Sequence, residues 1–188
     1  MRVISGSFKG KKIFEPKDNK TRPLKDLAKE SIFNIIEHSN KFNAQIIDSN
    51  ILDLFSGVGS FGIECLSRGS KKVVFIENYS GVLPILKKNL SSLKLVKNYE
   101  ILEHDIYSDK VLSKLNNKFD IIFLDPPFKD KNINTFLLKL KNYKILNKNG
   151  VIIIHRHKDD NDDFSEKFKV VDEKKYGISK ISFLTNLN

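Results

Sequence analysis

The chain has 188 residues, 40% of them hydrophobic, which is enough for one main domain with a substantial core and a small appendage. Its apolar stretches run only a few residues before a charge, and Met1 is not followed by a basic and then an apolar segment, so we expect no membrane span or signal peptide. Cys65 is the only cysteine, which excludes a disulfide framework and fits a reducing cytoplasm. The net charge of +10 predicts attraction to a polyanion.

The N-terminal segment carries much of this charge. Residues 1–30 hold nine basic and four acidic side chains, 9 − 4 = +5, or half of the total. Residues 2–13 alternate loosely and are broken by glycines, which predicts a small hairpin. Its candidates for contacts with nucleic-acid phosphates are Arg2, Lys9, Lys11 and Lys12. Residues 24–38 place apolar side chains on one helical face, so we expect a helix to follow.

From residue 46 onward, strand-like runs alternate with helical patterns, which is typical of a parallel sheet with helices on both faces. The expected strands are 51–55, 72–77, 99–102, 119–125, 151–155, 168–171 and 178–184, and the last two should form an antiparallel hairpin. The expected helices are 60–68, 80–93 with Ser80 as its cap, 108–115 and 132–143. Residues 148–150 predict a turn, and the acidic run 159–163 predicts a solvated loop.

Residues 53–62 combine a strand, a glycine-rich turn and the start of a helix, in the spacing of a nucleotide-binding loop. Gly57 and Gly59 would let the backbone turn sharply beside a ligand, and Gly62 would let the helix lie close to the strand. Glu77 ends the next strand 77 − 57 = 20 residues later, where a carboxylate can hold both ribose hydroxyls. A tight turn without a ligand is therefore the weaker interpretation.

The nucleotide expected at this loop is S-adenosylmethionine rather than NAD. Asp53 would repel a pyrophosphate, but it suits the ammonium group and the sulfonium charge of S-adenosylmethionine. Asp105 offers an acceptor for the adenine amino group, or else a helix cap, and Ile106 offers a backbone N–H to a ring nitrogen. The complete set of expected cofactor-binding residues is Asp53, Phe55, Ser56, Gly57, Gly59, Glu77, Asn78, Asp105 and Ile106.

Asp125-Pro126-Pro127-Phe128 directly follows the apolar strand 119–125. Two prolines remove two backbone donors and prevent a helix from starting at once, so the chain leaves the strand extended. Asp125 and the Pro126 carbonyl can accept two N–H bonds from a planar amino group, while Phe128 stacks on the attached ring. We therefore assign the catalytic role to Asp125, Pro126, Pro127 and Phe128. Read alone, the tetrapeptide could also be a proline-rich turn in which Phe128 is merely packed.

The four histidines and the single cysteine show no zinc-ligand spacing, so no metal site is expected. Arg22 is a candidate for gripping RNA near the active site, since a guanidinium binds phosphate bidentately. An ion pair between Arg22 and Asp26 at the helix entry is the alternative, and the two interpretations have equal weight.

Nearly the whole chain resembles the bacterial 16S ribosomal RNA guanine-N2 methyltransferases of the RsmD type, which are class I methyltransferases. The resemblance rests on segments 2–6, 21–23, 52–59, 66–69 and 125–128, and on Tyr176-Gly177. Thr21-Arg22-Pro23 is its more specific part. Leu24, Leu27 and His155 differ from the family, which more often has polar or basic residues at the first two positions and an acidic one at the third.

The resemblance implies a Rossmann-like α/β fold with a seven-stranded, mostly parallel sheet and a small N-terminal hairpin-helix extension. Residues 1–45 would form the RNA-binding extension, and residues 46–188 the catalytic domain that binds S-adenosylmethionine. The implied activity is methylation of one guanine N2 amino group in small-subunit ribosomal RNA, within an assembling or assembled subunit. We expect a cytoplasmic monomer.

Other functions would use some of the same motifs. A DNA adenine-N6 methyltransferase shares the 125–128 chemistry but normally needs a separate target-recognition region, for which 188 residues leave little room. A glutamine methylator usually has asparagine at position 125, and an NAD-linked oxidoreductase leaves the proline pair unexplained. A non-enzymatic RNA-binding module would have no reason to place Asp53, Glu77, Asp105 and Asp125 at successive strand ends.

Overall fold

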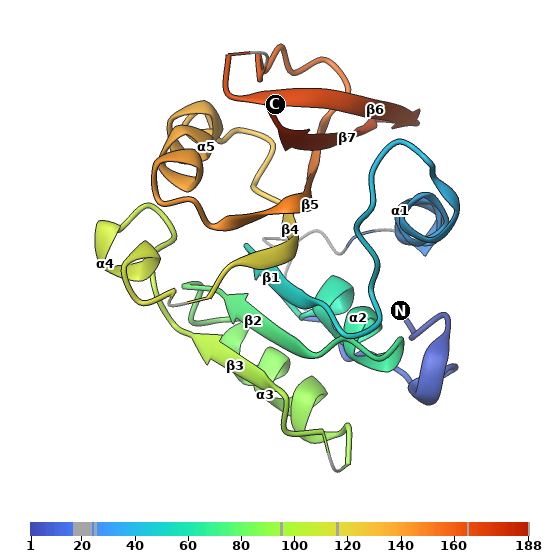
Figure 1. Cartoon of the computed structure of the whole chain (residues 1–188). Helices are drawn as coiled ribbons and strands as arrows, with labels where there is room; N and C mark the ends of the chain where they lie inside the picture. Colours follow the sequence, from blue (N-terminus) through green and yellow to red (C-terminus); the bar gives the residue numbers. More distant parts are fainter. Residues whose placement is uncertain (17–23, 25, 95, 116, 165, 188) are drawn as a thin grey trace.

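The computed structural model describes the whole chain except residues 17–23, 25, 95, 116, 165 and 188. Its centre is a seven-stranded sheet in the order β3-β2-β1-β4-β5-β7-β6, as Figure 1 shows. The strands are β1 (Asn50–Leu54), β2 (Lys72–Ile76), β3 (Tyr99–Leu102), β4 (Phe119–Leu124), β5 (Leu146–His157), β6 (Phe168–Tyr176) and β7 (Ser179–Asn186). The seven-stranded Rossmann-like sheet predicted from the sequence is confirmed.

The first five strands pair in parallel, and the last two close the sheet as an antiparallel hairpin. β1 pairs with β2 and β4, β2 with β3, and β4 with β5, all in parallel. β7 runs antiparallel to both β5 and β6. After β3 the chain crosses to the other side of β1 and continues with β4. The carboxyl ends of β1 and β4 therefore lie side by side at a topological switch point, where such sheets bind ligands.

Helices cover both faces of the sheet. They are α1 (Asp26–His38), α2 (Ser60–Ser67), α3 (Leu83–Ser91), α4 (Asp109–Leu112) and α5 (Ile133–Asn142), with a short 3-10 turn at Gly6–Phe8. One apolar cluster joins α1, α2 and α3 to one face of the sheet, and a second joins α4 and α5 to the other face. The near-continuous apolar strands, such as Ile121–Leu124, fit this burial on both sides.

The N-terminal arm, defined here as residues 1–16, forms the small hairpin that the sequence predicted. The Val3 N–H donates to the Lys11 carbonyl at 2.9 Å, the Gly10 N–H donates to the Val3 carbonyl at 2.9 Å, and Arg2 and Lys12 form an antiparallel bridge. Val3 and Ile13 are buried in the same apolar cluster as α1 and α2. The arm is thus packed onto the domain as part of its core.

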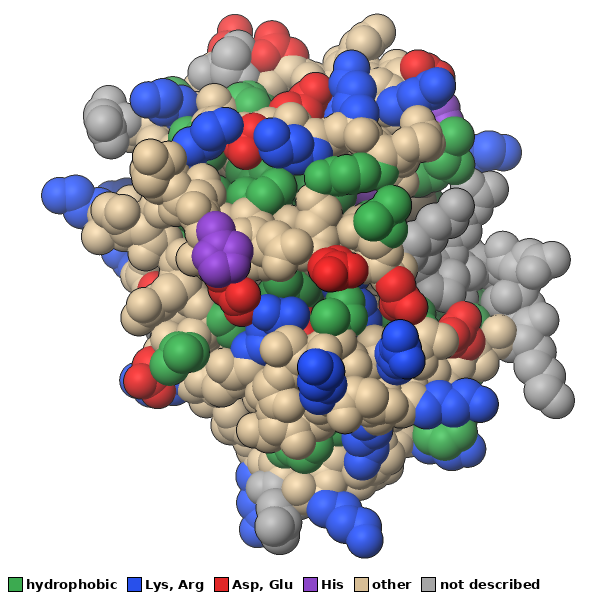
Figure 2. All heavy atoms as spheres, turned by 90° about the vertical axis from the view of Figure 1, so that its right-hand side faces the viewer, with side chains coloured by type: hydrophobic (Ala, Val, Ile, Leu, Met, Phe, Trp, Pro, Cys, Tyr) green, Lys and Arg blue, Asp and Glu red, His purple; other side chains and the backbone are tan. Residues whose placement is uncertain are grey.

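Two buried charges fix the arm to the helices beneath it. Glu64 accepts hydrogen bonds from the backbone N–H groups of Ile4 at 2.8 Å and Ser5 at 2.9 Å. The fully buried Lys29 donates to the Arg2 carbonyl at 2.8 Å and lies 3.8 Å from Glu64. Burial lowers the pKa of Lys29, and the negative charge of Glu64 acts against this shift. Figure 2 shows the face that carries α1, where basic side chains are spread over the surface and interspersed with apolar and acidic ones.

Two local predictions are wrong. Ser80 does not cap α3, because the helix begins at Leu83 with Val82 as its cap residue and Pro84 in its first turn. Residues 148–150 lie inside β5 rather than in a turn before it. β4 and β5 pair at Phe119–Leu146 and again at Ile121–Val151, so the extra residues of β5 form an irregularity within the strand. Gly150, on which the turn prediction rested, lies within that irregularity.

Among the described residues, no helix has the length and apolar character needed to cross a bilayer. The same part of the chain contains no cluster of three or more His, Cys, Asp or Glu side chains that could hold a metal ion.

Candidate active site

The two loops expected to carry the chemistry lie next to each other. The glycine-rich loop follows β1, and the 125–128 tetrapeptide follows β4, the strand that pairs with β1 at Leu54–Leu124. The Asp125 N–H points to the Leu54 carbonyl at 3.4 Å, which extends this pairing by one residue beyond the strands. The fold therefore brings the predicted cofactor loop and the predicted acceptor loop to one edge of the sheet.

The glycine loop has the backbone geometry that its glycines were expected to provide. Gly57 has φ of 54° and Gly59 has φ of 82°, and residues other than glycine rarely adopt such positive φ angles. A Cβ atom on Gly62 would lie 2.3 Å from the Phe75 ring, so only glycine lets α2 lie this close to β2. Phe55 also has a positive φ of 56°, without being glycine, and local backbone strain of this kind is concentrated at functional sites.

Glu77 joins the end of β2 to this loop. One carboxylate oxygen accepts a hydrogen bond from the Gly57 N–H at 2.8 Å. The other accepts from Asn78 N–H at 2.9 Å and from Tyr79 N–H at 2.8 Å. These bonds fix the carboxylate beside the loop, where the sequence had expected it to bind a ribose.

Asp53 lies beneath the loop and is 1% exposed. Its Oδ2 accepts a hydrogen bond from the Gly62 N–H at 2.9 Å, which connects β1 to the first turn of α2. Burial raises the pKa of Asp53 well above its usual value, and the negative charges of Asp125 and Glu77 raise it further. The Gly62 bond acts in the opposite direction. A positively charged ligand group would favour the ionised form of this carboxyl.

The loop after β3 supplies the remaining part of the expected cofactor site. Asp105 is exposed and accepts a hydrogen bond from the Tyr107 N–H at 3.0 Å, while Ile106 is buried. The Tyr107 ring packs edge-on against Phe55, with ring centroids 6.0 Å apart. Contact between the glycine loop and the loop after β3 is thus made through aromatic rings. The adenine-binding roles of Asp105 and Ile106 stay predictions.

The tetrapeptide presents a carboxylate and a carbonyl, as expected. Asp125 is partly buried, with 19% of its side chain exposed. The Pro127 carbonyl accepts a hydrogen bond from the Asp130 N–H at 2.8 Å, whereas no described residue donates to the Pro126 carbonyl. The Phe128 ring packs edge-on against His155 at 5.6 Å and His157 at 5.3 Å between centroids. Asp125 and the Pro126 carbonyl are therefore available to one ligand amino group.

Arg156 is a residue of the site that sequence reasoning missed. It is buried in β5, and its guanidinium donates to the Asp130 carbonyl at 2.8 Å and to the Pro127 carbonyl at 3.4 Å. Its Nε donates to Asp162 at 2.8 Å. Arg156 thus fixes the loop that follows Asp125. An arginine inside a buried strand, a few residues before an acidic run, was the signal that could have identified it.

The acidic run 159–163 is accordingly more than a solvated loop. Asp160 lies 3.4 Å from the Arg156 guanidinium, and Asp162 lies closer, at 2.8 Å. A buried arginine requires such partners because an unpaired charge in the interior is costly. The run neutralises the residue that fixes the acceptor loop.

The predicted RNA-binding residues occupy different parts of the arm. Arg2, Lys9 and Lys12 are exposed, whereas the Lys11 amino group donates to the Ser92 carbonyl beyond α3. The hairpin tip packs on the last turn of α2, where the Phe8 N–H donates to Ser67 at 2.9 Å. Since α2 begins at the glycine loop, this tip lies at the far end of the helix from Asp125. Arg22 lies outside the described residues.

The far end of the arm approaches the cofactor loop instead. The buried Asn89 side chain accepts a hydrogen bond from the Phe14 N–H at 2.8 Å and donates to the Phe14 carbonyl and to the Val58 carbonyl, both at 3.0 Å. Val58 belongs to the glycine loop. One amide therefore links the arm, α3 and the cofactor loop, and the sequence analysis did not single it out.

Comparison with known proteins places this geometry in a family. The family described as Conserved hypothetical protein 95 matches residues 1–185. Ribosomal RNA small subunit methyltransferase D of Haemophilus influenzae is 33% identical over 179 residues, covering 95% of this chain and 90% of that protein. The chain belongs to the ribosomal RNA small subunit methyltransferase D family. The family resemblance seen in the sequence is confirmed.

Further relatives agree. YlbH of Bacillus subtilis is 36% identical over 156 residues, covering 81% of this chain and 80% of that protein. The solved structure of the Escherichia coli protein yhhF matches with a TM-score of 0.80 and 25% identity, covering 99% of this chain and 97% of that one. As a member of a methyltransferase family, the chain uses S-adenosylmethionine as its cofactor. The turn at Gly57 and Gly59, with Glu77 beside it, fits that cofactor.

Proposed function

We propose that this chain transfers a methyl group from S-adenosylmethionine to the exocyclic N2 amino group of a guanine in small-subunit ribosomal RNA. The observation that carries the proposal is the adjacency of the two loops, joined where the Asp125 N–H meets the Leu54 carbonyl at 3.4 Å. The relatives named ribosomal RNA small subunit methyltransferase D support ribosomal RNA as the substrate class. The two acceptors in the tetrapeptide support an amino group as the reacting group.

The bound cofactor supplies a methyl group on a positively charged sulfur. The guanine amino nitrogen is a poor nucleophile because its lone pair is delocalised into the ring. By accepting both N–H bonds, Asp125 and the Pro126 carbonyl draw this nitrogen toward a pyramidal geometry and direct its lone pair at the methyl group. Phe128 holds the base by stacking, which contributes ~1–3 kcal/mol per base in nucleic-acid complexes. As the nitrogen–methyl bond forms, the sulfur–methyl bond breaks, and the methylated nitrogen then loses one proton along one of these hydrogen bonds. Positioning, rather than prior removal of a proton, is the role of these residues.

The target base must leave its stack to reach this site, which favours a loop or a flipped nucleotide. We propose that the exposed basic residues of the arm contact RNA phosphates, and that the substrate is RNA within a small-subunit particle. Arg2, Lys9 and Lys12 have the exposure that this requires. Residues 1–45 then serve as the RNA-binding extension, although their apolar side chains belong to the core of the domain.

The test is transfer of a labelled methyl group from S-adenosylmethionine to naked small-subunit RNA and to assembled small subunits, followed by mapping of the modified nucleotide. The expected product is N2-methylguanine at one position, with the particle as the better substrate. Asp125→Ala serves as the inactive control. Label in DNA, in an adenine or in protein would contradict the proposal, and the first two outcomes would favour an adenine methyltransferase.

A further inference from the structure

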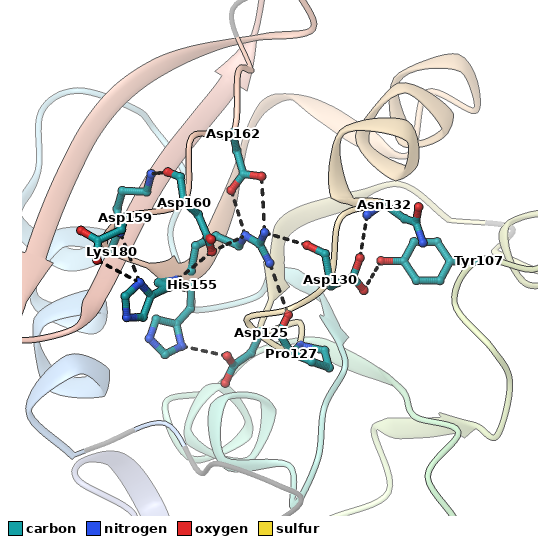
Figure 3. A network of polar contacts seen from close by, with 12 residues as sticks. Tyr107, Asp125, Pro127, Asp130, Asn132, His155, Asp159, Asp160, Asp162 and Lys180 are labelled. Atoms are coloured by element: carbon teal, nitrogen blue, oxygen red, sulfur yellow. Dashed lines mark hydrogen bonds and ion pairs between the residues drawn. The ribbon is translucent and has the colours of Figure 1, made fainter.

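Asp125 has a direct partner in the neighbouring strand. His155 lies in β5, one residue beyond the Leu124–Ile154 pair of β4 and β5. Its Nδ1 is 2.8 Å from Asp125 Oδ1, and 10% of the His155 side chain is exposed. Figure 3 shows the two side chains facing one another across the strands. The proposed catalytic carboxylate is therefore held by a second side chain.

The chemistry of the pair decides which atom donates. An ionised carboxylate only accepts hydrogen bonds, so the bond places a hydrogen on His155 Nδ1. In a neutral imidazole, Nε2 then carries a lone pair and no hydrogen. His155 Nε2 is buried and has no hydrogen-bond partner among the described residues. The tautomer with hydrogen on Nδ1 leaves only an acceptor unpaired there, rather than a buried N–H group.

The hydrogen bond restricts how the Asp125 carboxylate can rotate. With Oδ1 bound to His155, Oδ2 has no partner among the described residues and can accept one N–H of a substrate amino group. The Pro126 carbonyl, to which no described residue donates, remains free for the other. A carboxylate without this hydrogen bond would rotate about its side-chain bond and spend only part of the time in the orientation that the substrate amino group requires.

His155 is itself held in place from several sides. In the sheet it pairs with Ile181 of β7. Its ring packs edge-on against Phe128, with centroids 5.6 Å apart and an interplanar angle of 76°. The next residue, Arg156, fixes the loop that carries Phe128 through the Pro127 and Asp130 carbonyls. The imidazole is thus pre-oriented before any substrate arrives.

We propose that His155 is a positioning residue for methyl transfer: its Nδ1–H orients the Asp125 carboxylate toward the acceptor amino group. This inference rests on the proposed function, because Asp125 must contact the acceptor for its orientation to matter. It assigns to His155 an effect on the rate of transfer, and none on cofactor binding.

Two substitutions separate this role from simple packing. The side-chain nitrogen of asparagine reaches the position of histidine Nδ1, whereas that of glutamine reaches the position of Nε2. His155→Asn therefore restores the donor to Asp125, and His155→Gln does not, although both fill part of the same space. His155→Ala removes both the Nδ1 donor and the imidazole ring.

The experiment measures kcat and KM for methylation of small-subunit particles, together with affinity for S-adenosylhomocysteine by calorimetry. His155→Gln and His155→Ala are expected to lower kcat by about 10- to 100-fold, the effect of losing a hydrogen bond to a charged group. The kcat of His155→Asn should stay within about threefold of the wild-type kcat, because the hydrogen bond to Asp125 is kept. Cofactor affinity should not change, and unfolding in urea shows whether each variant is folded.

A signal independent of activity comes from the ¹⁵N chemical shifts of His155. The wild type should show the Nδ1–H tautomer, and Asp125→Ala should shift the ring toward the other tautomer. Equal kcat in all three His155 variants, or an Nε2–H tautomer in the wild type, would overturn the role of His155. If the wild type itself transfers no methyl group to RNA, the proposed function fails instead. The two failures are thus distinguished.

Discussion

The Glu77 carboxylate accepts a hydrogen bond from the Gly57 backbone N–H at 2.8 Å, joining the end of β2 to the glycine loop after β1. Its second oxygen accepts from Asn78 and Tyr79. One side chain thus organises three backbone N–H groups around the predicted ribose position. Loss of the Glu77 side chain removes the support of the loop and, with it, the predicted ribose contact.

We expect Glu77→Ala to weaken binding of S-adenosylhomocysteine by about tenfold or more, and to lower the free energy of unfolding by roughly 2–3 kcal/mol, because hydrogen bonds to a charged acceptor are lost. Calorimetry and urea unfolding measure the two effects. Glu100→Ala in neighbouring β3 is the matched control, since among the described residues the Glu100 carboxylate forms just an exposed ion pair with Lys72 at 2.7 Å. Unchanged cofactor affinity in Glu77→Ala would remove Glu77 from the cofactor site.

Asp53 is expected to contribute to the binding of S-adenosylmethionine and to lower the free energy of unfolding by an amount that depends on pH. Its pKa in the folded chain is raised, chiefly by burial, above the value in the unfolded chain. The folded state therefore holds this proton more tightly, so its contribution to stability is present at low pH and is lost as pH rises through the folded pKa. Asp53→Asn removes this titration while keeping an oxygen for the Gly62 N–H.

The free energy of unfolding of Asp53→Asn should accordingly increase relative to that of the wild type as pH rises above about 4. The affinity of the variant for S-adenosylmethionine should be lower than that of the wild type. Urea unfolding over a series of pH values and calorimetry measure these changes. Asp109→Asn is the control for replacing a carboxylate by an amide, at a side chain that is 72% exposed and paired with Lys139. A free energy of unfolding of Asp53→Asn that falls relative to that of the wild type with rising pH would show that folding does not raise the pKa of Asp53.

Gly62→Ala tests the close approach of α2 to β2. The added methyl group would lie 2.3 Å from the Phe75 ring, which is fully buried. We expect a loss of about 1–3 kcal/mol in the free energy of unfolding, as in other overpacked cores. Ser60→Ala in the same helix is the control, because the buried Ser60 hydroxyl has no partner among the described residues. Urea unfolding of both variants should therefore give clearly different results.

The features that the sequence predicted well are those set by nearby residues. The glycine loop, the 125–128 tetrapeptide and Glu77 each lie within a few residues of a strand end, and the parallel sheet then brings these ends to one edge. Family resemblance supplied the substrate class, which no local pattern contained.

The features that were missed depend on contacts between distant segments. Arg156 binds the Pro127 carbonyl, 29 residues away in the chain, and no periodic pattern records such a pairing. Asn89 reaches Phe14 across 75 residues. The turn expected at residues 148–150 failed for a related reason, since pairing with β4 continues past those residues and absorbs them as an irregularity. Tertiary contacts overrode the local signal in each case.

Arg156→Lys tests whether the acceptor loop needs a guanidinium. Lysine keeps the positive charge near Asp162, but its single nitrogen cannot occupy both positions from which Nη1 and Nη2 of Arg156 contact the Pro127 and Asp130 carbonyls. We expect kcat for methyl transfer to fall by about 10- to 100-fold with unchanged cofactor affinity, since a small displacement of reacting groups is costly. Arg68→Lys is the control, because Arg68 pairs with Glu64 at 3.0 Å away from the tetrapeptide. Equal kcat in both variants would make Arg156 purely structural.

Asp125→Ala should abolish methyl transfer, by about 1000-fold or more, because it removes the acceptor that positions the amino nitrogen in the transition state. Affinity for S-adenosylhomocysteine should remain close to that of the wild type, since Asp125 follows β4 and the cofactor loop follows β1. Asp120→Ala, near the start of the same strand, is the matched control: its carboxylate binds Asn50 N–H at 2.8 Å and the Asn147 side chain at 2.6 Å, so stability should fall while kcat persists. Single-turnover transfer and calorimetry separate the two effects. Lost cofactor binding in Asp125→Ala would instead place this carboxylate in the S-adenosylmethionine site, and other residues would have to position the acceptor amino group.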